Sequence, residues 1–236
     1  MIRIYKIIGK ILLGVMVALV LVFAGVYLFY NEKLPVTETS VEADQLAQKM
    51  LEAIGHKAYK QTNYIEWTFV GRNHYKWNKQ QQIVEVTIGE TVVELNIQQP
   101  ELSTVLVNDT EVKGNAKLEA VESAISNFNN DSFWLVAPHK VFDPGTERGI
   151  VELENGEKAL LVTYTSGGNT SGDSYLWLLD ETGLPTAFKM WVSIMPMGGI
   201  EATWESWQAA ESGALFSTHH KFLFLDIPME DVIARK

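Results

Sequence analysis

Twenty consecutive uncharged residues, Ile11 to Tyr30, constrain this chain more than any other feature of its sequence. An α-helix needs about 20 apolar residues to cross a bilayer core of roughly 30 Å. Arg3, Lys6 and Lys10 precede the segment, and positive charge beside a span tends to stay in the cytoplasm. The sequence therefore predicts a cytoplasmic N-terminus over residues 1–10, a transmembrane anchor over residues 11–30, and an exported remainder. We expect a single-pass protein of the cytoplasmic (inner) membrane, with its C-terminal domain in the periplasm or another extracytoplasmic space.

A cleaved signal peptide is the alternative interpretation of the same segment. Its apolar core usually spans only about 7 to 15 residues and ends in a small-x-small cleavage site. Here the segment ends in Tyr27, Phe29 and Tyr30, which is typical of an aromatic belt at a membrane interface, and Ala24 and Gly25 offer a poor cleavage site. The pattern favours a retained signal-anchor. Because the chain has no cysteine, neither a disulfide framework nor a lipid-modified cysteine is expected.

The exported part is expected to form one domain behind a short linker. Residues 31–40 are polar and contain a proline, a composition that suits a spacer rather than packed structure. Residues 41–236 show no repeat or shift of composition and are long enough for one substantial core. The chain has a net charge of −10; the three basic residues before the anchor contribute +3, so the remainder carries −13. This acidic balance argues against nucleic acid as a partner and against resting the domain on anionic lipid.

Two helices are marked in the exported part. Thr39 and Glu42 have the spacing of a capping box, apolar residues recur every four positions, and Gly55 stands where a helix would stop, so a helix is predicted over residues 41–54. A second helix is predicted over residues 116–128, where one face carries Leu118, Val121, Ile125 and Phe128.

The stretch "NNDSFWLVAPHKVFDPG", residues 129–145, follows the second helix directly. Asn129 to Asp131 is expected to end that helix. Asp131 or Ser132 can then cap a further short helix that Pro138 stops. This short helix would bring two large aromatic side chains, Phe133 and Trp134, toward the sheet described next.

Most of the remaining sequence alternates apolar and polar residues, which is the pattern of an antiparallel sheet with one face covered. The clearest examples are Ile65-Trp67-Phe69, Val84-Val86-Ile88, Val93-Leu95-Ile97, Leu160-Val162-Tyr164 and Phe188-Met190-Val192. Turn signals at Asn155-Gly156, Asp180 to Gly183 and Met195 to Gly199 predict hairpins, the last leading into a strand over residues 201–207. The expected fold is mainly β with helices, of the α+β class: a curved antiparallel sheet of about ten short strands with helices on its apolar face.

The hairpin "YLWLLDETGLPTAFKM", a leading helix and an exported meander interrupted by helices together resemble the LolA/LolB-like superfamily of periplasmic lipoprotein carriers and lipid-binding proteins. Trp177 to Pro185 is the most specific part of the resemblance. It implies, for residues 41–236, an unclosed β-barrel with helices over its concave face and acyl chains held between them. Carriers of this kind are typically soluble or lipid-modified, whereas this chain is expected to keep a helical anchor. That difference argues against shuttling but not against binding.

A cavity of this kind would take a lipid, an acyl chain or a lipoprotein, and no cofactor is expected. Phe133 and Trp134 would lie across its mouth, while other large apolar residues on strands could share the concave face. The loop of residues 194–200, with two Met, two Ile and a Gly pair, is expected to be a mobile apolar loop at the rim. The candidate ligand-binding residues are Trp67, Phe133, Trp134, Trp177, Met190, Met195, Met197 and Trp204. For any single aromatic, plain core packing is the alternative.

Catalysis is the second hypothesis, and no motif in the sequence supports it. His56, His74, His139, His219 and His220, with Asp143 and Asp173, could in principle supply a general base or metal ligands. However, the chain has no H-E-x-x-H and no G-x-S-x-G, and "GGNTSGD" at residues 167–173 lies between two strands rather than before a helix. His219 and His220 would point to opposite faces of a strand and could not both bind one metal. We therefore expect no catalytic and no metal-binding residues.

A third hypothesis is a tethered sensor or assembly adaptor whose cavity or sheet edge binds a protein partner, since fold does not fix function. The cytoplasmic segment is too short to carry an output of its own, so signalling would require a membrane-protein partner. This hypothesis and the lipid hypothesis stay open at the level of sequence.

Overall fold

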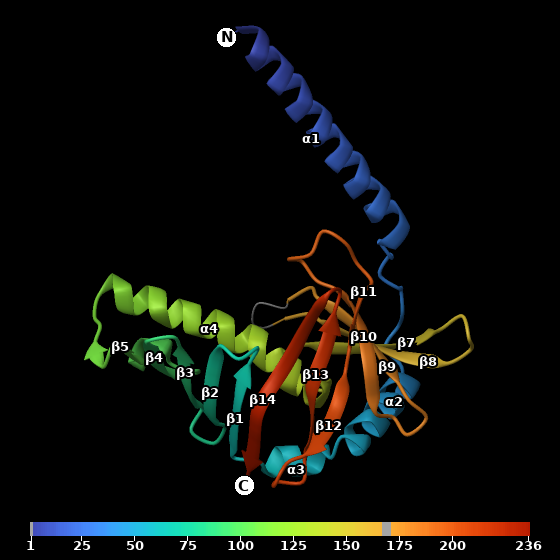
Figure 1. The fold of residues 1–236 in the computed structure, drawn as a ribbon. Coiled ribbons are helices and arrows are strands. Elements are labelled where there is room, and N and C mark those ends of the chain that lie inside the picture. Colours follow the sequence, from blue (N-terminus) through green and yellow to red (C-terminus); the bar gives the residue numbers. More distant parts are fainter. Residues whose placement is uncertain (1, 167–170) are drawn as a thin grey trace.

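The computed structural model describes residues 2–166 and 171–236, with side chains from Lys10 onward. Part of the loop at residues 167–173 and the side chains of most of the expected cytoplasmic segment therefore lie outside the described residues. The first element is a long helix, α1 (Ile2–Tyr30), which stands clear of the rest of the chain (Figure 1). Its apolar part, Lys10–Tyr30, has the length and composition needed to cross a membrane, and none of it is buried in the protein.

The part of the chain after the linker begins with two short helices that meet at a sharp turn. Helix α2 (Val41–Ala53) has Ser40 as its N-cap, whose hydroxyl accepts a hydrogen bond from the Ala43 amide at 3.1 Å. The expectation that Thr39 caps this helix is wrong, because Thr39 instead pairs with a strand. Gly55 has φ +68 and leads into α3 (His56–Gln61). A Cβ there would lie 2.9 Å from a backbone oxygen of Gly213, so the turn requires glycine.

Fourteen strands form one antiparallel sheet in two meanders. Strands β1 to β6 run outward from the centre, β7 to β13 run inward from the other edge, and β14 pairs with β1 to join the two halves. The strand path ends at β6 and at β7 and, within the described residues, does not close into a barrel. The chain thus has the α+β class and the open, curved antiparallel sheet that the sequence predicts.

The strand bounds are β1 (Tyr64–Phe69), β2 (Asn73–Asn78), β3 (Ile83–Ile88), β4 (Thr91–Asn96), β5 (Thr104–Val107), β6 (Thr110–Glu111), β7 (Thr146–Glu152), β8 (Lys158–Tyr164), β9 (Ser174–Leu179), β10 (Pro185–Trp191), β11 (Ile200–Thr203), β12 (Glu205–Ala209), β13 (Leu215–Phe222) and β14 (Leu225–Arg235). The three expected hairpin turns are confirmed between β7 and β8, β9 and β10, and β10 and β11. The expected strand over residues 201–207 is divided at Trp204. Its buried ring and its amide bond to the Thr186 carbonyl break the run, so β11 pairs with β10 whereas β12 pairs only with β13.

A single helix, α4 (Asn115–Val136), crosses the concave face, followed by a 3-10 turn over Ala137–Lys140 (Figure 1). The expectation that residues 129–131 divide it into two helices is wrong. The Asp131 carboxyl does not cap a helix, because its Oδ2 accepts hydrogen bonds from the Tyr75 hydroxyl at 2.5 Å and from Asn73 Nδ2 at 2.8 Å. These bonds attach α4 to β2 and allow the helix to continue to Phe133 and Trp134.

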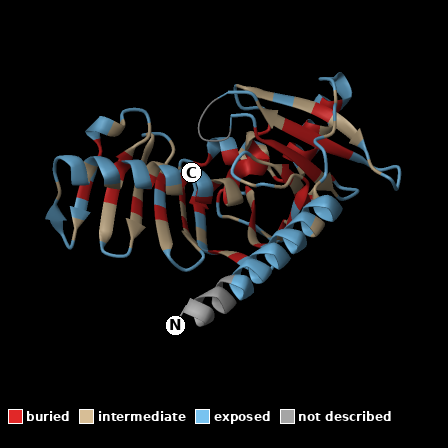
Figure 2. Ribbon diagram, turned by 90° about the horizontal axis from the view of Figure 1, so that it is seen from above, coloured by how far each residue is buried: buried red, intermediate tan, exposed pale blue. Residues whose placement is uncertain are grey.

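Two large apolar clusters form the core on the concave face, and a small third cluster of Ala159, Leu161 and Leu176 lies on the opposite face of β8 and β9. One large cluster lies between the β1–β5 half and α4, and includes Trp67, Tyr75 and Phe128. The other lies between β8–β11, α2 and the C-terminal end of α4, and includes Trp177 and Trp204. Figure 2 shows buried residues inside both halves and an exposed α1. Because α4 contributes to both clusters, it holds the two halves of the sheet together.

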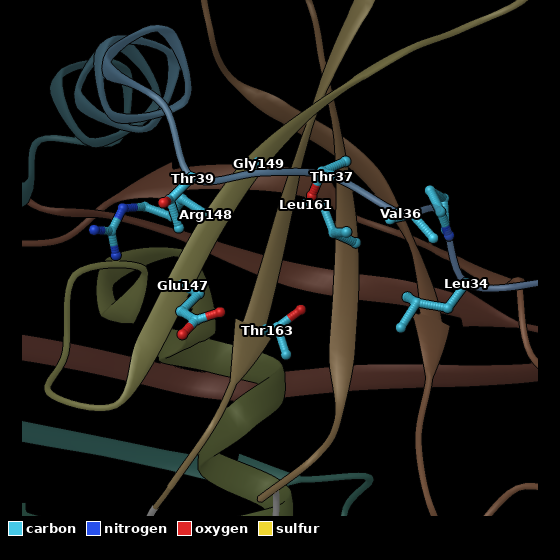
Figure 3. Close-up of a pocket in the computed structure, with 10 residues that line it drawn as sticks. Leu34, Val36, Thr37, Thr39, Glu147, Arg148, Gly149, Leu161 and Thr163 are labelled. Carbon is cyan, nitrogen blue, oxygen red and sulfur yellow. The ribbon is translucent and has the colours of Figure 1, made fainter.

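The linker, residues 31–40, is packed on the outer face of the sheet, which differs from the free spacer expected from its composition. Thr39 pairs with Gly149 of β7, and a Cβ at Gly149 would lie 2.0 Å from Thr37 Oγ1. Glycine is therefore required for the linker to approach so closely. Leu34, Val36 and Thr37 line a hollow of about 270 Å³ between the linker and β7–β8 (Figure 3).

The start of the linker is fastened to the β10–β11 loop by a group that we call the Glu32 clasp. The Glu32 amide donates to the Gly198 carbonyl at 3.0 Å, and the Gly198 amide donates to Asn31 Oδ1 at 2.9 Å. Lys189 Nζ lies 2.7 Å from Glu32 Oε1, and the Trp191 indole N–H donates to the Glu32 carbonyl at 2.8 Å. The clasp follows α1 directly, because Asn31 is the first residue after the helix. The β10–β11 loop therefore lies beside the end of the apolar helix.

Candidate functional site

The main candidate site is a cavity of about 320 Å³ between α4 and strands β9, β10 and β13. We call it the α4 cavity. Its volume lies near the lower end of the range for ligand pockets, about 300 to 1,000 Å³. Its lining is mainly apolar and consists of Ser126, Asn129, Asn130, Phe133, Trp134, Asp173, Tyr175, Met190, Val192, Ile194, Met195 and Phe222.

Aromatic side chains form the floor of the α4 cavity. The Phe133 ring centroid lies 4.6 Å from that of Tyr175 and 6.1 Å from that of Trp134, which in turn lies 6.0 Å from that of Phe222. Each ring comes from a different position on α4, β9 or β13, so the sheet and the helix both shape the floor. Met190 of β10 and the loop residues Val192, Ile194 and Met195 complete it, and methionine adapts to ligands of varying shape.

Few polar groups line the cavity. Ser126, Asn129 and Asn130 lie on exposed positions of α4. Asp173, just before β9, is buried and accepts a hydrogen bond from the Ser193 amide at 2.9 Å. Burial raises the pKa of this carboxyl, with the Ser193 bond opposing the shift. An apolar floor with few polar groups suits an amphiphilic ligand rather than a highly charged one.

The structure brings together four of the eight residues predicted for the site, namely Phe133, Trp134, Met190 and Met195. Trp67 lies across α4 in the other cluster, with its ring 4.7 Å from that of Tyr75. The remaining three residues do not line the α4 cavity. Trp177 and Trp204 pack together in the core with their ring centroids 5.3 Å apart, and Met197 is half-buried in the β10–β11 loop.

Eight lining residues were missing from the predicted set, and four of these are apolar: Tyr175, Val192, Ile194 and Phe222. Tyr175 precedes Trp177 by two positions and Val192 follows Met190 at the same spacing, so period-two alternation indicates the cavity side for both. Ile194 belongs to the loop of residues 194–200 that was expected at the rim. Phe222 joins the site only because β13 returns to the sheet beside β11. That pairing is a property of topology, which the local pattern does not contain.

A second cavity, of about 310 Å³, lies on the other side of α4. It shares Asn129 and Phe133 with the α4 cavity and reaches Trp77 and Tyr164. The end of α4 therefore divides a hollow rather than filling a closed core. Phe133 and Trp134 therefore lie at the α4 cavity, as expected from the sequence of residues 129–145.

The histidines are placed as structural groups. His139 is buried with its ring 4.1 Å from that of Tyr59, and its Nε2 lies 3.1 Å from the Leu215 carbonyl oxygen. Burial lowers the pKa of His139 to about 3 and that of His220 to about 4. His220 faces the core whereas His219 is half-exposed beside Glu205, which confirms that the pair points to opposite faces. Among the residues the structure describes, no group of three His, Asp or Glu side chains could hold a metal ion.

One hydrogen-bonded trio has the order of a hydrolase triad. Thr68 Oγ1 lies 2.9 Å from His74 Nδ1, and His74 Nε2 lies 3.1 Å from Glu66 Oε1. The trio lies on the face of the sheet opposite Trp67, outside the α4 cavity. Strand β1 is paired on both sides, with β2 and β14, so its backbone N–H groups are engaged rather than free to stabilise an oxyanion. The arrangement is that of cross-strand surface pairs.

We predict that no histidine is essential for activity. His74→Gln and His219→Gln should leave ligand binding or any measurable turnover within a few fold, because a general acid or base contributes about 10² to 10⁴-fold. His139→Gln should lower stability but leave the activity of the folded fraction within the same range. The assay is run beside circular dichroism. A loss of about 10²-fold at His74 with the fold intact would support catalysis by the Thr68 trio.

Comparisons with known proteins bear on the fold. No family model matches the chain, and no curated protein matches it in sequence. A DUF1329 family protein from Desulfovibrio piger is similar in structure, with 9% identity, coverage of 84% of this chain and 93% of its own, and a TM-score of 0.39. A LolA superfamily protein from Nitrosomonas europaea is similar with 11% identity, coverage of 86% and 95%, and a TM-score of 0.38. Both likenesses have TM-scores below 0.5 and say nothing of a ligand, which has to be inferred from this chain's own residues.

Proposed function

We propose that this protein is a membrane-anchored, exported binding protein that holds an acyl chain of a lipid or lipoprotein in the α4 cavity. The observation that carries the proposal is the cavity itself. Its floor is built from Phe133, Trp134, Tyr175 and Phe222, and few of its lining residues are polar. Burial of an acyl chain against such a floor contributes about 0.8 kcal/mol for each CH₂ group.

The anchor supports local handling of the ligand rather than transport across a compartment. Helix α1 has the length and composition of a single span, and the Glu32 clasp fastens the domain at the end of that span. A protein held in this way would take up or present its ligand at the membrane in which it is anchored. Binding, and not catalysis, is the proposed activity; a hydrolase using the Thr68 trio is the weaker alternative.

The first test is mass spectrometry of organic extracts of the full chain purified in mild detergent. Stoichiometric lipid is the expected result. A co-purified membrane protein in place of lipid would favour the adaptor hypothesis, and absence of both would contradict the proposal.

A matched pair of methionines in one loop provides the second prediction. Met195 lines the α4 cavity and Met197 does not, although both are half-buried. Met195→Ser should weaken binding of a fluorescent fatty acid by about tenfold, because it removes an apolar contact worth about 1.5 kcal/mol. Met197→Ser should leave binding within about twofold, and both variants should melt within a few degrees of wild type because rim loops contribute little to the core.

Equal losses of affinity in the two variants would contradict the assignment of the α4 cavity. A large fall in melting temperature for Met195→Ser, with unaltered binding by the folded fraction, would show that Met195 is a core residue.

The third prediction concerns the anchor. The mature protein should retain the apolar segment, because that segment ends in Tyr27, Phe29 and Tyr30 rather than in small residues. N-terminal sequencing of protein from the membrane fraction checks this. A mature chain that begins near residue 26 would make the protein a soluble carrier.

A further inference from the structure

The tip of the β13–β14 hairpin is apolar and exposed. Phe222 and Leu225 pair across the turn, and Leu223 and Phe224 form the turn itself, with Phe224 87% exposed. Two-residue hairpin turns usually carry Gly, Asn or Asp, because positive φ values are needed there. Leu223 has φ +55, which a branched side chain rarely adopts. Neither turn geometry nor solubility accounts for these two residues.

The hairpin protrudes beyond its neighbour β1. Strand β14 pairs with β1 only from Met229, opposite Phe69, onward, and the Val70 amide bonds to the Pro228 carbonyl. The residues from Leu225 to Ile227 therefore extend past the β1–β2 turn by about 10 Å at the rise of an antiparallel strand. Figure 1 shows this hairpin pointing toward the same side as α1.

The strand register places the tip at the level of the clasped loop. Ala202 of β11 lies opposite Phe222 of the antiparallel β13, so Ile200, two residues earlier, lies level with Phe224. The β10–β11 loop directly precedes Ile200, and in this loop Ile194 is 82% exposed. Phe222 and Ile194 also line the α4 cavity. The apolar tip, the exposed loop residue and the cavity mouth thus lie at one end of the domain.

The Glu32 clasp fixes what this end of the domain faces. Gly198 of the same loop is hydrogen-bonded to Asn31 and Glu32, the first two residues after α1. If α1 spans a bilayer, the loop must lie at the bilayer surface, and the hairpin tip lies at the same level. No charged residue occurs between Lys221 and Asp226, so the tip can enter the apolar part of the interface.

We propose that residues 222–225 of the β13–β14 hairpin, together with Ile194, dip into the bilayer that α1 spans, so that the α4 cavity receives acyl chains directly from the membrane. This inference rests on the proposed function for its ligand, but the insertion of the tip rests only on the anchor, the clasp and the exposed residues. The proposed partner of the hairpin tip is the lipid surface.

The test of insertion uses the natural absence of cysteine. The full chain carrying Phe224→Cys is labelled with an environment-sensitive fluorophore and reconstituted in phosphatidylcholine vesicles. Glu211→Cys, an exposed position at the opposite end of β13, is the matched control and lies about 25 Å away along the strand. The label at 224 should shift to the blue and be quenched by lipids with a spin label near the headgroup, whereas the label at 211 should show neither effect. Equal, water-like emission at both positions would overturn the proposal.

A second variant tests delivery. Leu223→Ser combined with Phe224→Ser changes only exposed side chains and should melt like wild type. It should take up a fluorescent fatty acid from vesicles about tenfold more slowly, equivalent to about 1.4 kcal/mol, while uptake of the same fatty acid added in water is unchanged. Equal slowing from both sources would overturn direct delivery, because the tip would then act as part of the cavity. If wild type takes up no fatty acid from either source while the label at 224 is quenched, the proposed function fails and the inserted tip stands.

Discussion

Asp131→Leu should lower the free energy of unfolding by about 3 kcal/mol, because it leaves the buried Tyr75 hydroxyl and the Asn73 amide without their acceptor. Each unsatisfied buried group costs about 1 to 3 kcal/mol. The same change detaches α4 from β2, so the fatty-acid affinity of the folded fraction should fall as well. Chemical denaturation and a binding assay on the same preparation measure both effects.

A double variant separates the hydrogen bonds from simple loss of volume. Tyr75→Phe combined with Asp131→Leu removes one unsatisfied donor and should recover about 1 kcal/mol relative to Asp131→Leu alone. Glu122→Leu, an exposed change on the same helix, serves as the control and should alter stability by less than about 0.5 kcal/mol. A loss below about 1 kcal/mol for Asp131→Leu would show that α4 is held by its apolar contacts alone.

The domain should become less stable as the pH falls below 6.5. His139 and His220 have folded-state pKa values lowered by burial to about 3 and about 4, from 6.5 in the unfolded chain. Below pH 6.5 the unfolded state therefore binds more protons than the folded state, so stability present above pH 6.5 is lost as the pH falls. Each histidine contributes a slope of about 1.4 kcal/mol per pH unit between pH 6.5 and its folded pKa.

Carboxyl groups modify this dependence at its acidic end. Asp143 and Asp173 have pKa values raised by burial, so the folded state binds their protons more readily and regains some stability as the pH approaches 4. Denaturation at pH 7, 6 and 5 avoids that region. His139→Gln should remove a large part of the slope, because His139 is one of the histidines whose pKa burial lowers. A slope unchanged in His139→Gln would contradict the assignment.

The fold was largely predictable because its elements have local signals. Period-two alternation marked strands such as β3 and β8, and Asn155-Gly156 marked the turn between β7 and β8. Gly156 has φ +83 but Asn155 does not have positive φ, and the loop is closed by a hydrogen bond between Leu153 and Glu157, so the turn is longer than the two-residue type I′ turn typical of this pair. The site was only half predictable. Trp67 and Trp177 have the same alternation as Met190 and also lie on the concave face, but α4 and the second core cluster cover them. Which concave residues border a hollow depends on where α4 lies, and that depends on the long-range bonds of Asp131.

The packed linker shows the same limit. Its composition is that of a flexible segment, and nothing in residues 31–40 alone indicates that Gly149 and Gly198 would make room for it. The glycines that admit the linker lie more than 100 residues later in the chain. From the sequence, Gly198 was expected to give the loop backbone freedom. The structure shows that its lack of a side chain, which lets the linker approach, matters at least as much.

The Glu32 clasp also limits how the domain can move before it meets a ligand. A flexible linker of ten residues would have a root-mean-square end-to-end distance of about 18 Å and would leave the domain free to rotate. Because residues 31–39 are bonded to the sheet, the conformational entropy of the linker is lost during folding. It is not lost again each time a ligand binds. With α1 in a bilayer, as we propose, the domain would diffuse with its anchor in two dimensions at a fixed height and orientation. Every collision with a membrane-resident ligand would meet the same face of the protein.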